Sequence, residues 1–216
     1  MSYAAVVFDL DGTLLDSLAD IAHAANEVLA GLALPTHPLD RYRYLVGDGV
    51  AMLFERALPE ERREAALIER CVAGFRTTYA TQWNRLSRPY EGIAEMLDGL
   101  VARRCRLAVL SNKPQEFTEQ CVAEFFSAWP MQPVFGQRAG TPRKPDPAGA
   151  IEIAAAWGLP ARECLYLGDT SVDMQTARNA GMFAVGALWG FRPREELEAH
   201  GAEALVAHPR DVLALI

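Results

Sequence analysis

The sequence predicts an open α/β sheet of parallel strands, with a helical insertion after the first strand. Three observations predict this fold class. Short apolar runs are continuous rather than alternating, as expected for strands buried on both faces. Segments with helical spacing separate the later runs, and the stretch 17–86 has helical patterns but no clear strand.

The strands and helices are expected in regular alternation. The first strand is Ala4–Phe8, which leads directly into charged residues. The later expected strands are Arg106–Leu110, Pro133–Phe135, Cys164–Leu167, Phe183–Val185 and Ala204–Val206. The expected helices of this part are Gly92–Arg103, Gln115–Phe125, Asp146–Trp157 and Val172–Ala180. Alternation of this kind predicts right-handed crossovers in one parallel sheet.

The inserted stretch reads as helix throughout. Ser17 and Asp20 resemble a capping box, with Asp in place of the usual Glu or Gln. The further expected helices are Leu39–Leu58 and Glu60–Trp83. We therefore expect two domains. Residues 1–15 and 87–216 would form an open parallel-sheet, Rossmann-like core, and residues 16–86 would form a small all-helical cap domain.

Composition excludes several function classes. The net charge of −7 argues against a broad nucleic-acid surface or an anionic membrane partner. No apolar run approaches the roughly 18 residues that a membrane span needs, and the N-terminus does not read as a signal peptide. The four cysteines lack CxxC or zinc spacing, which favours reduced thiols in a cytoplasmic protein. We expect a monomer or homodimer.

Polar side chains follow three of the expected strands. They are Asp9 and Asp11, Ser111 and Asn112, and Asp169. Ligands bind at the carboxyl ends of parallel strands, so these residues are expected to meet at one edge. Two carboxylates about 4 Å apart repel by about 4 kcal/mol at an effective dielectric near 20. A divalent cation would remove that cost, and carboxylate, carbonyl and water ligands suit Mg²⁺.

This set of residues suits phosphoryl transfer. A strand-end carboxylate can attack phosphorus and form an aspartyl-phosphate. A second carboxylate can protonate the leaving oxygen and later deprotonate water. A lysine and small donors would neutralise the phosphoryl oxygens. Lys144 in TPRKPDP offers such a lysine, and Asp169 and Asp173 lie in GDTSVDMQTARNAG.

Four motifs carry a resemblance to a known family. They are DLDGTLLDS at 9–17, LSNKP at 110–114, RKPDP at 143–147 and GDTSVDMQTARNAG at 168–181. With these motifs in this order, the chain resembles the haloacid-dehalogenase-type phosphohydrolases, and specifically their phosphoglycolate-phosphatase-like branch. The late WGFRPREEL is similar to that branch, and the helical stretch matches the cap that such enzymes carry after the first strand.

The resemblance implies a role for each matching residue. Asp9 would be the nucleophile and a metal ligand. Asp11 would be the general acid and base, with its backbone carbonyl on the metal, and Asp169 would ligate Mg²⁺ directly. Asp173 and Thr13 would support the metal site without binding the metal themselves. The position of Thr13 favours phosphate chemistry over dehalogenation. The residues that would bind the phosphoryl group are Ser111, Asn112 and Lys144, the last also catalytic.

Each of these residues has a structural alternative. The paired aspartates could form a turn and a helix N-cap. Asp169 could cap the helix that starts near Ser171. Ser111 and Asn112 could cap the helix after Pro114. Lys144 could be a solvent-exposed lysine in a turn.

A Gly-rich segment, VGDGV at 46–50, lies in the inserted stretch. It lacks the ending of a phosphate loop and does not follow a strand, so nucleotide binding is not expected. In the resembling branch such a stretch faces the active site, so Gly47, Asp48 and Gly49 are expected to line the substrate side of the closed cap. A helix-start turn is the alternative. Arg41 and Arg43 are candidates to meet an anionic substrate tail.

The expected function is a magnesium-dependent phosphatase for a small phosphorylated metabolite, acting through an aspartyl-phosphate. Phosphoglycolate is the first candidate by resemblance, and sugar phosphates, nucleoside monophosphates and pyrophosphate stay open. A phosphomutase or phosphotransferase acting on sugar phosphates is a second hypothesis. A catalytically silent binding protein is a third, and the full set of reactive residues argues against it. The helical insertion and the DxDGT pair disfavour a receiver-type phosphoacceptor.

Overall fold

The computed structural model describes residues 3–216, so the first two residues of the expected core segment 1–15 lie outside the described residues. The chain divides into two compact units. One unit contains the chain up to Leu15 together with Pro89–Ile216, and the other contains Asp16–Arg88. We call the first the sheet unit and the second the helical unit.

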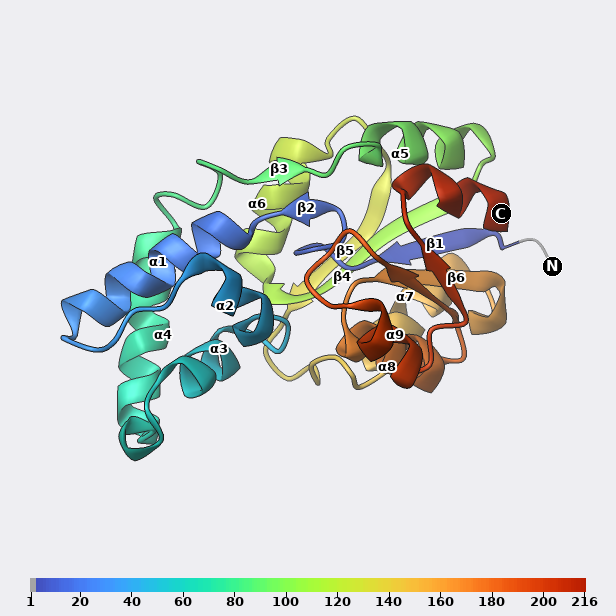
Figure 1. The fold of residues 1–216 in the computed structure, drawn as a ribbon. Coiled ribbons are helices and arrows are strands. Elements are labelled where there is room, and N and C mark those ends of the chain that lie inside the picture. The colour runs from blue at the N-terminus through green and yellow to red at the C-terminus, as the bar shows by residue number, and fades with distance from the viewer. Residues whose placement is uncertain (1–2) are drawn as a thin grey trace. The chain divides into compact units, whose positions relative to one another are not determined.

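A six-stranded sheet forms the centre of the sheet unit (Figure 1). Its strand order is β5-β4-β1-β6-β7-β8, and all five neighbouring pairs are parallel. The strands are β1 Ala5–Phe8, β4 Arg106–Pro114, β5 Met131–Gln137, β6 Cys164–Gly168, β7 Phe183–Ala187 and β8 Ala204–Val206. The predicted fold class, an open parallel α/β sheet with a helical insertion after its first strand, is confirmed.

Helices cover both faces of this sheet. The helices of the sheet unit are α5 Ile93–Ala102, α6 Gln115–Phe125, α7 Ala148–Trp157, α8 Ser171–Ala180 and α9 Arg194–Ala199, with 3₁₀ turns η2 Ala161–Glu163 and η3 Pro209–Leu215. Figure 1 shows α5 and η3 on one face and α7 and α8 on the other. On the second face, Val7 of β1 packs in one apolar cluster with Ile153 and Met174. Burial on both faces explains why the central strands are continuous apolar runs.

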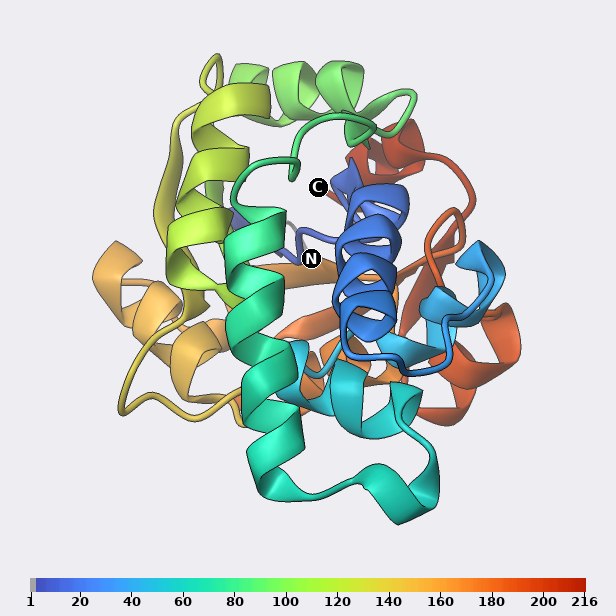
Figure 2. The ribbon, with the colours of Figure 1, turned by 90° about the vertical axis from the view of Figure 1, so that its left-hand side faces the viewer.

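The helical unit contains α1 Leu18–Gly31, α2 Leu39–Leu45, α3 Val50–Ala57, η1 Glu60–Arg62 and α4 Ala65–Tyr79. Figure 2 shows α1 and α4 running antiparallel, and the two helices pack together. The prediction of a single helix over Leu39–Leu58 is wrong, because a turn interrupts the helix between α2 and α3. Gly47 and Gly49 have φ of 119° and 87° there, a backbone region closed to a right-handed helix. The expected helix Glu60–Trp83 is likewise interrupted after η1.

Two short strands join the units. They are β2 Leu15–Asp16 and β3 Arg88–Pro89, which pair as a separate two-stranded sheet. Neither strand was predicted, because two residues carry no periodic signal. Asp20 does not close the expected capping box with Ser17. Its buried carboxylate instead accepts hydrogen bonds from the Ser87 backbone N–H at 2.8 Å and the Ser87 hydroxyl at 2.7 Å.

The composition-based expectations can be compared with the structure at two points. Across residues 3–216, no helix combines the length and apolar character that crossing a bilayer requires. All four cysteines lie among the described residues, where they are buried and form no disulfide: Cys71, Cys105, Cys121 and Cys164.

Candidate active site

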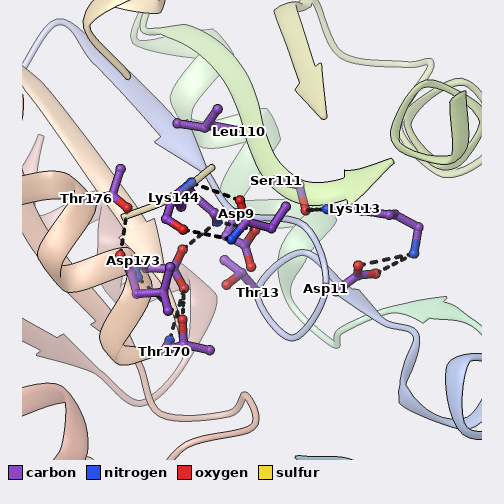
Figure 3. A network of polar contacts seen from close by, with 12 residues as sticks. Asp9, Asp11, Thr13, Leu110, Ser111, Lys113, Lys144, Thr170, Asp173 and Thr176 are labelled. Atoms are coloured by element: carbon purple, nitrogen blue, oxygen red, sulfur yellow. Dashed lines mark hydrogen bonds and ion pairs between the residues drawn. The ribbon is translucent and has the colours of Figure 1, made fainter. Parts of the chain in front are cut away.

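The carboxyl ends of β1, β4 and β6 bring the candidate residues of the sheet unit together (Figure 3). Asp9 directly follows β1, and its backbone N–H donates to the Leu167 carbonyl on β6 at 2.9 Å. Asp169 directly follows β6 and is fully buried. Ser111 and Asn112 lie on β4 itself and are also buried. Polar side chains buried in this way need hydrogen-bond or ion-pair partners, and the residues that supply these partners belong to the site.

Three buried carboxylates crowd together at this edge. Asp9, Asp169 and Asp173 each place one oxygen so that the three oxygens lie within 4.8 Å of one another. Burial raises the pKa of Asp9 to about 7, against the lowering effect of Lys144. Burial and the neighbouring carboxylates also raise the pKa of Asp169 well above its ordinary value. Full ionisation of this cluster is therefore costly unless more positive charge is present.

Lys144 provides one positive charge inside the cluster. Its side chain is buried, and its Nζ donates to Asp9 Oδ1 and to Asp173 Oδ1, each at 2.7 Å. Burial lowers the pKa of Lys144, but the carboxylates of Asp173 and Asp9 outweigh burial and raise it well above its ordinary value. The ammonium therefore stays charged. One ammonium against three carboxylates leaves two negative charges, which matches a divalent cation.

The donor atoms fit a hard cation such as Mg²⁺. The carboxylates of Asp9 and Asp169 could hold it, and the backbone carbonyl of Asp11 as a further ligand stays a prediction. Asp169 and Asp173 both accept hydrogen bonds, but Asp173 is less available because its Oδ1 forms an ion pair with the Lys144 ammonium at 2.7 Å. Its Oδ2 accepts from both the Thr170 N–H at 3.1 Å and the Thr170 hydroxyl at 2.7 Å. Asp173 therefore orients the site through hydrogen bonds.

Asp169 is held by donors on both of its oxygens. The Thr13 hydroxyl donates to Oδ1 at 2.9 Å, and the Phe191 backbone N–H donates to Oδ2 at 2.8 Å. Gly12 permits this approach, since its φ is +92° and a Cβ there would lie 2.3 Å from Asp169 Oδ2. The alternative that Asp169 caps the following helix is wrong. The N-cap of α8 is Thr170, which forms a capping box with Asp173.

Asp11 pairs with Lys113, a lysine that was not predicted to belong to the site. Lys113 Nζ lies 2.9 Å from Asp11 Oδ1 and 3.2 Å from Oδ2. Figure 3 shows the Asp11 side chain turned towards Lys113 and away from Asp9. Asp9 clusters with Asp169 and Asp173, and Asp11 adds a smaller repulsion that also raises the pKa of Asp9. The only sequence signal for Lys113 is its place in LSNKP.

Asn112 fastens the loop that carries Lys144. Its Nδ2 donates to the Lys144 carbonyl at 3.1 Å, and its Oδ1 accepts from the Lys144 N–H at 3.0 Å. Ser111 Oγ accepts from the Lys113 N–H at 3.3 Å, which leaves its hydroxyl hydrogen able to donate. Neither residue caps the next helix, whose N-cap is Pro114 without a side-chain hydrogen bond.

The remaining predicted residues belong to the helical unit. Gly47, Asp48 and Gly49 lie in the turn between α2 and α3, and Gly49 is the N-cap of α3. Asp48 Oδ2 accepts from Arg56 NH2 at 2.5 Å, so this carboxylate helps to shape the turn. Arg41 and Arg43 lie on α2. A role of these five residues towards a substrate stays a prediction.

Two aromatic residues also contact the site, and neither was predicted to have a role there. The Tyr166 hydroxyl lies 3.4 Å from Asp173 Oδ1, and Lys144 Nζ lies 5.8 Å from the Tyr166 ring centroid. Trp189 Nε1 donates to the Thr13 carbonyl at 2.9 Å. Within the sequence, Tyr166 reads as one more apolar strand residue, and Trp189 is notable only as part of WGFRPREEL.

Comparisons with known proteins agree on one family. A family model described as haloacid dehalogenase-like hydrolase matches residues 6–187. Phosphoglycolate phosphatase of Pseudomonas syringae pv. tomato is 34% identical over 194 residues, which cover 86% of this chain and 70% of the relative. Phosphoglycolate phosphatase of Xylella fastidiosa is 33% identical over 193 residues, which cover 88% and 82%.

Solved structures show the same fold. A crystal structure of a protein from Lactobacillus delbrueckii subsp. bulgaricus matches with a TM-score of 0.93 and 29% identity, covering 100% of this chain and 99% of that chain. A haloacid dehalogenase-like family hydrolase from Streptococcus pneumoniae matches with a TM-score of 0.87 and 21% identity, covering 98% and 97%. The second likeness concerns the fold alone.

Proposed function

The chain belongs to the haloacid dehalogenase-like hydrolases, and from this premise we propose that it is a magnesium-dependent phosphatase that acts through an aspartyl-phosphate on Asp9. The observation that carries the proposal is the position of Asp9. It directly follows β1, is buried, and lies within reach of Lys144 and of two further carboxylates. A carboxylate in that position is a nucleophile whose surroundings can neutralise a phosphoryl group.

In the first step, a carboxylate oxygen of Asp9 forms a bond to phosphorus while the bond from phosphorus to the ester oxygen breaks. Asp11 donates a proton to that leaving oxygen. Lys144 and the Ser111 hydroxyl donate hydrogen bonds to the transferring oxygens. When bound, Mg²⁺ would lower the repulsion between the Asp9 carboxylate and the phosphate ester.

In the second step, Asp11 accepts a proton from water as the water oxygen bonds to phosphorus. The bond from phosphorus to Asp9 breaks, which releases inorganic phosphate and restores the Asp9 carboxylate. Asn112 contributes by holding the Lys144 backbone in place. Asp173 contributes by holding the Lys144 ammonium beside Asp9.

We propose phosphoglycolate as the first substrate to test, because the two relatives described above carry that activity in their names. We also propose that the sheet unit is the catalytic core and that the helical unit selects the substrate. This assignment is supported by the sheet unit containing every residue assigned a chemical step. We further propose a small phosphorylated metabolite as the ligand, a monomer or homodimer, and a cytoplasmic setting. The setting is supported by four cysteines that form no disulfide.

The test is phosphate release from a panel of phosphate monoesters, with Mg²⁺ and with a chelator. The proteins compared are wild type, Asp9→Asn, and Asp40→Asn as a control at a carboxylate whose side chain is 95% exposed. We expect Mg²⁺-dependent release by the wild type and the control, and none by Asp9→Asn. Release that survives in Asp9→Asn would refute the proposed nucleophile. No release from any ester by folded, Mg²⁺-bound protein would refute the phosphatase, and a sugar-bisphosphate isomerisation assay would then separate a mutase from a silent binding protein.

A further inference from the structure

The turn that follows β7 reaches back to the candidate metal site. We call Trp189, Gly190 and Phe191 the WGF turn. Trp189 Nε1 donates to the Thr13 carbonyl at 2.9 Å, and the Phe191 N–H donates to Asp169 Oδ2 at 2.8 Å. The Thr13 hydroxyl donates to the other oxygen of Asp169 at 2.9 Å. These three hydrogen bonds, together with the backbone from Trp189 to Phe191, form a closed ring through Thr13 and Asp169.

This ring connects two segments that are distant in sequence. Thr13 lies in the loop that begins at Asp9, and Asp169 lies at the end of β6. Both residues are fully buried, as is nearly all of Phe191. The two hydrogen bonds to Asp169 are buried, and such bonds hold their groups in one arrangement because solvent cannot replace a lost partner. The orientation of the Asp169 carboxylate therefore depends on the WGF turn.

The middle residue of the turn packs directly on the same side chain. A Cβ on Gly190 would lie 2.2 Å from Asp169 Cβ and 2.5 Å from Asp169 Oδ2. Atoms at those distances overlap, so any side chain at position 190 would displace Asp169. The φ of Gly190 is outside the left-handed region, which means that an alanine here would act through this contact rather than through backbone strain.

We propose that the WGF turn is a positioning element for the metal site, which orients Asp169 and ties it to the loop that carries Asp9. This inference rests on the proposed function in so far as Asp169 ligates Mg²⁺. Removal of a group that hydrogen-bonds a metal ligand typically weakens metal binding by about 10- to 100-fold. The turn thereby sets the affinity for Mg²⁺.

The matched variants separate positioning from general packing. Trp189→Phe removes the indole donor to Thr13 and keeps an aromatic ring, and Gly190→Ala introduces the overlap with Asp169. Trp157→Phe is the control for the first, because Trp157 Nε1 also donates to a backbone carbonyl, that of Gln132 at 2.8 Å. Gly31→Ala is the control for the second, because a Cβ there would meet nothing within 4 Å.

The measurement is the dissociation constant of Mg²⁺ for the full chain by titration calorimetry, with the melting temperature of the metal-free protein as a check of folding. We expect Mg²⁺ binding to weaken about tenfold in Trp189→Phe and by up to about 100-fold in Gly190→Ala. Both controls should stay within about twofold of wild type. Saturating Mg²⁺ should restore most of kcat in Trp189→Phe with KM unchanged, which a packing defect would not do.

Three results would overturn the inference, and a fourth would separate it from the proposed function. Wild-type Mg²⁺ affinity in folded Trp189→Phe would overturn it, and so would an equal loss of affinity in Trp157→Phe. Absence of Mg²⁺ binding by the wild type would overturn it together with the metal part of the proposed function. Mg²⁺ binding that Trp189→Phe weakens, in a wild type that hydrolyses no ester, would support the inference while refuting the proposed function.

Discussion

Replacing Lys144 by methionine removes the positive charge from the centre of the carboxylate cluster while keeping a side chain of similar length. The Lys144 ammonium lies 2.7 Å from oxygens of both Asp9 and Asp173. At an effective dielectric near 20, each contact is an attraction of about 6 kcal/mol before the cost of burial is subtracted. Loss of one partner of a buried ion pair costs about 3–5 kcal/mol net, because the remaining charge is stranded.

This cost should be visible in thermal unfolding of the metal-free protein at pH 8. For a chain of this length, 1 kcal/mol shifts the melting temperature by about 2–4 °C, so Lys144→Met should melt roughly 6–20 °C below wild type. Arg143→Met, at the exposed neighbouring residue of the same loop, should shift it by less than about 2 °C. Phosphate release should also fall by about 10²-fold or more, because Lys144 is expected to stabilise the transferring group.

The loss of stability should be smaller at pH 5. Burial raises the pKa of Asp9 to about 7, so at pH 5 this carboxyl takes up a proton and needs the ammonium less. Equal melting temperatures for Lys144→Met and wild type at pH 8 would refute the reasoning, since a buried pair of carboxylates would then tolerate the loss of their shared cation.

Three further predictions concern the same network and the junction between the units. Folding raises the pKa of Asp9 from 3.8 to about 7. Between these pH values the folded, metal-free protein binds more protons than the unfolded chain, so its stability should fall as pH rises. For this group the loss is at most about 4 kcal/mol. Urea unfolding in chelator at pH 5 and pH 8 tests this, and Mg²⁺ should stabilise more at pH 8; stability that rises with pH would contradict it. Lys113→Met should lower kcat at least about tenfold with little change in KM, because Asp11 loses the ammonium that orients it. Lys113→Arg keeps a positive charge and should retain more activity. Equal kcat values for the two variants in steady-state assays would count against this role. Asp20→Ala strands the buried backbone N–H of Ser87, whereas the Ser87 hydroxyl keeps the Trp83 carbonyl as an acceptor at 3.0 Å. The loss should cost about 1–3 kcal/mol in thermal unfolding, and a loss within error of Asp40→Ala would show that the Asp20 contacts do not stabilise the fold.

Much of the sheet could be predicted because its physics is local. Strands buried on both faces must be apolar at every position, and β1, β6 and β7 are short runs that meet this requirement. Their parallel arrangement follows from the helices between them, since each crossover needs a dozen or more residues. Once the strands are placed, the polar residues at their carboxyl ends come to one edge without further information.

The helical unit was harder to predict because its breaks depend on single residues. Leu39–Leu58 has continuous helical spacing, and only Gly47 and Gly49 interrupt it with backbone angles that a helix excludes. The carboxylate of Asp20 was expected to serve its own helix, but a tertiary partner at Ser87 competes for it. Pairing of two-residue strands likewise depends on where the two junctions meet.

Within the site, residue types were easier to predict than partners. Asp9, Lys144 and Asp169 were recognisable because phosphoryl transfer needs carboxylates and a cation at strand ends. The pairing of Asp11 with Lys113, and the bond from Trp189 to Thr13, arise from contacts between segments far apart in sequence. No spacing rule encodes such contacts, so they emerge only from the folded chain.

The most direct test of the central claim is to trap the phosphoryl group on Asp9. Wild type would be mixed with Mg²⁺ and its best ester, quenched in acid within milliseconds, reduced with borohydride and analysed by peptide mass spectrometry. Borohydride reduces an aspartyl-phosphate to homoserine with loss of phosphate, so the account predicts homoserine at position 9 that requires both Mg²⁺ and ester and is absent from Asp9→Asn. Reduction at a different residue, or phosphate release with residue 9 unchanged at every quench time, would contradict it.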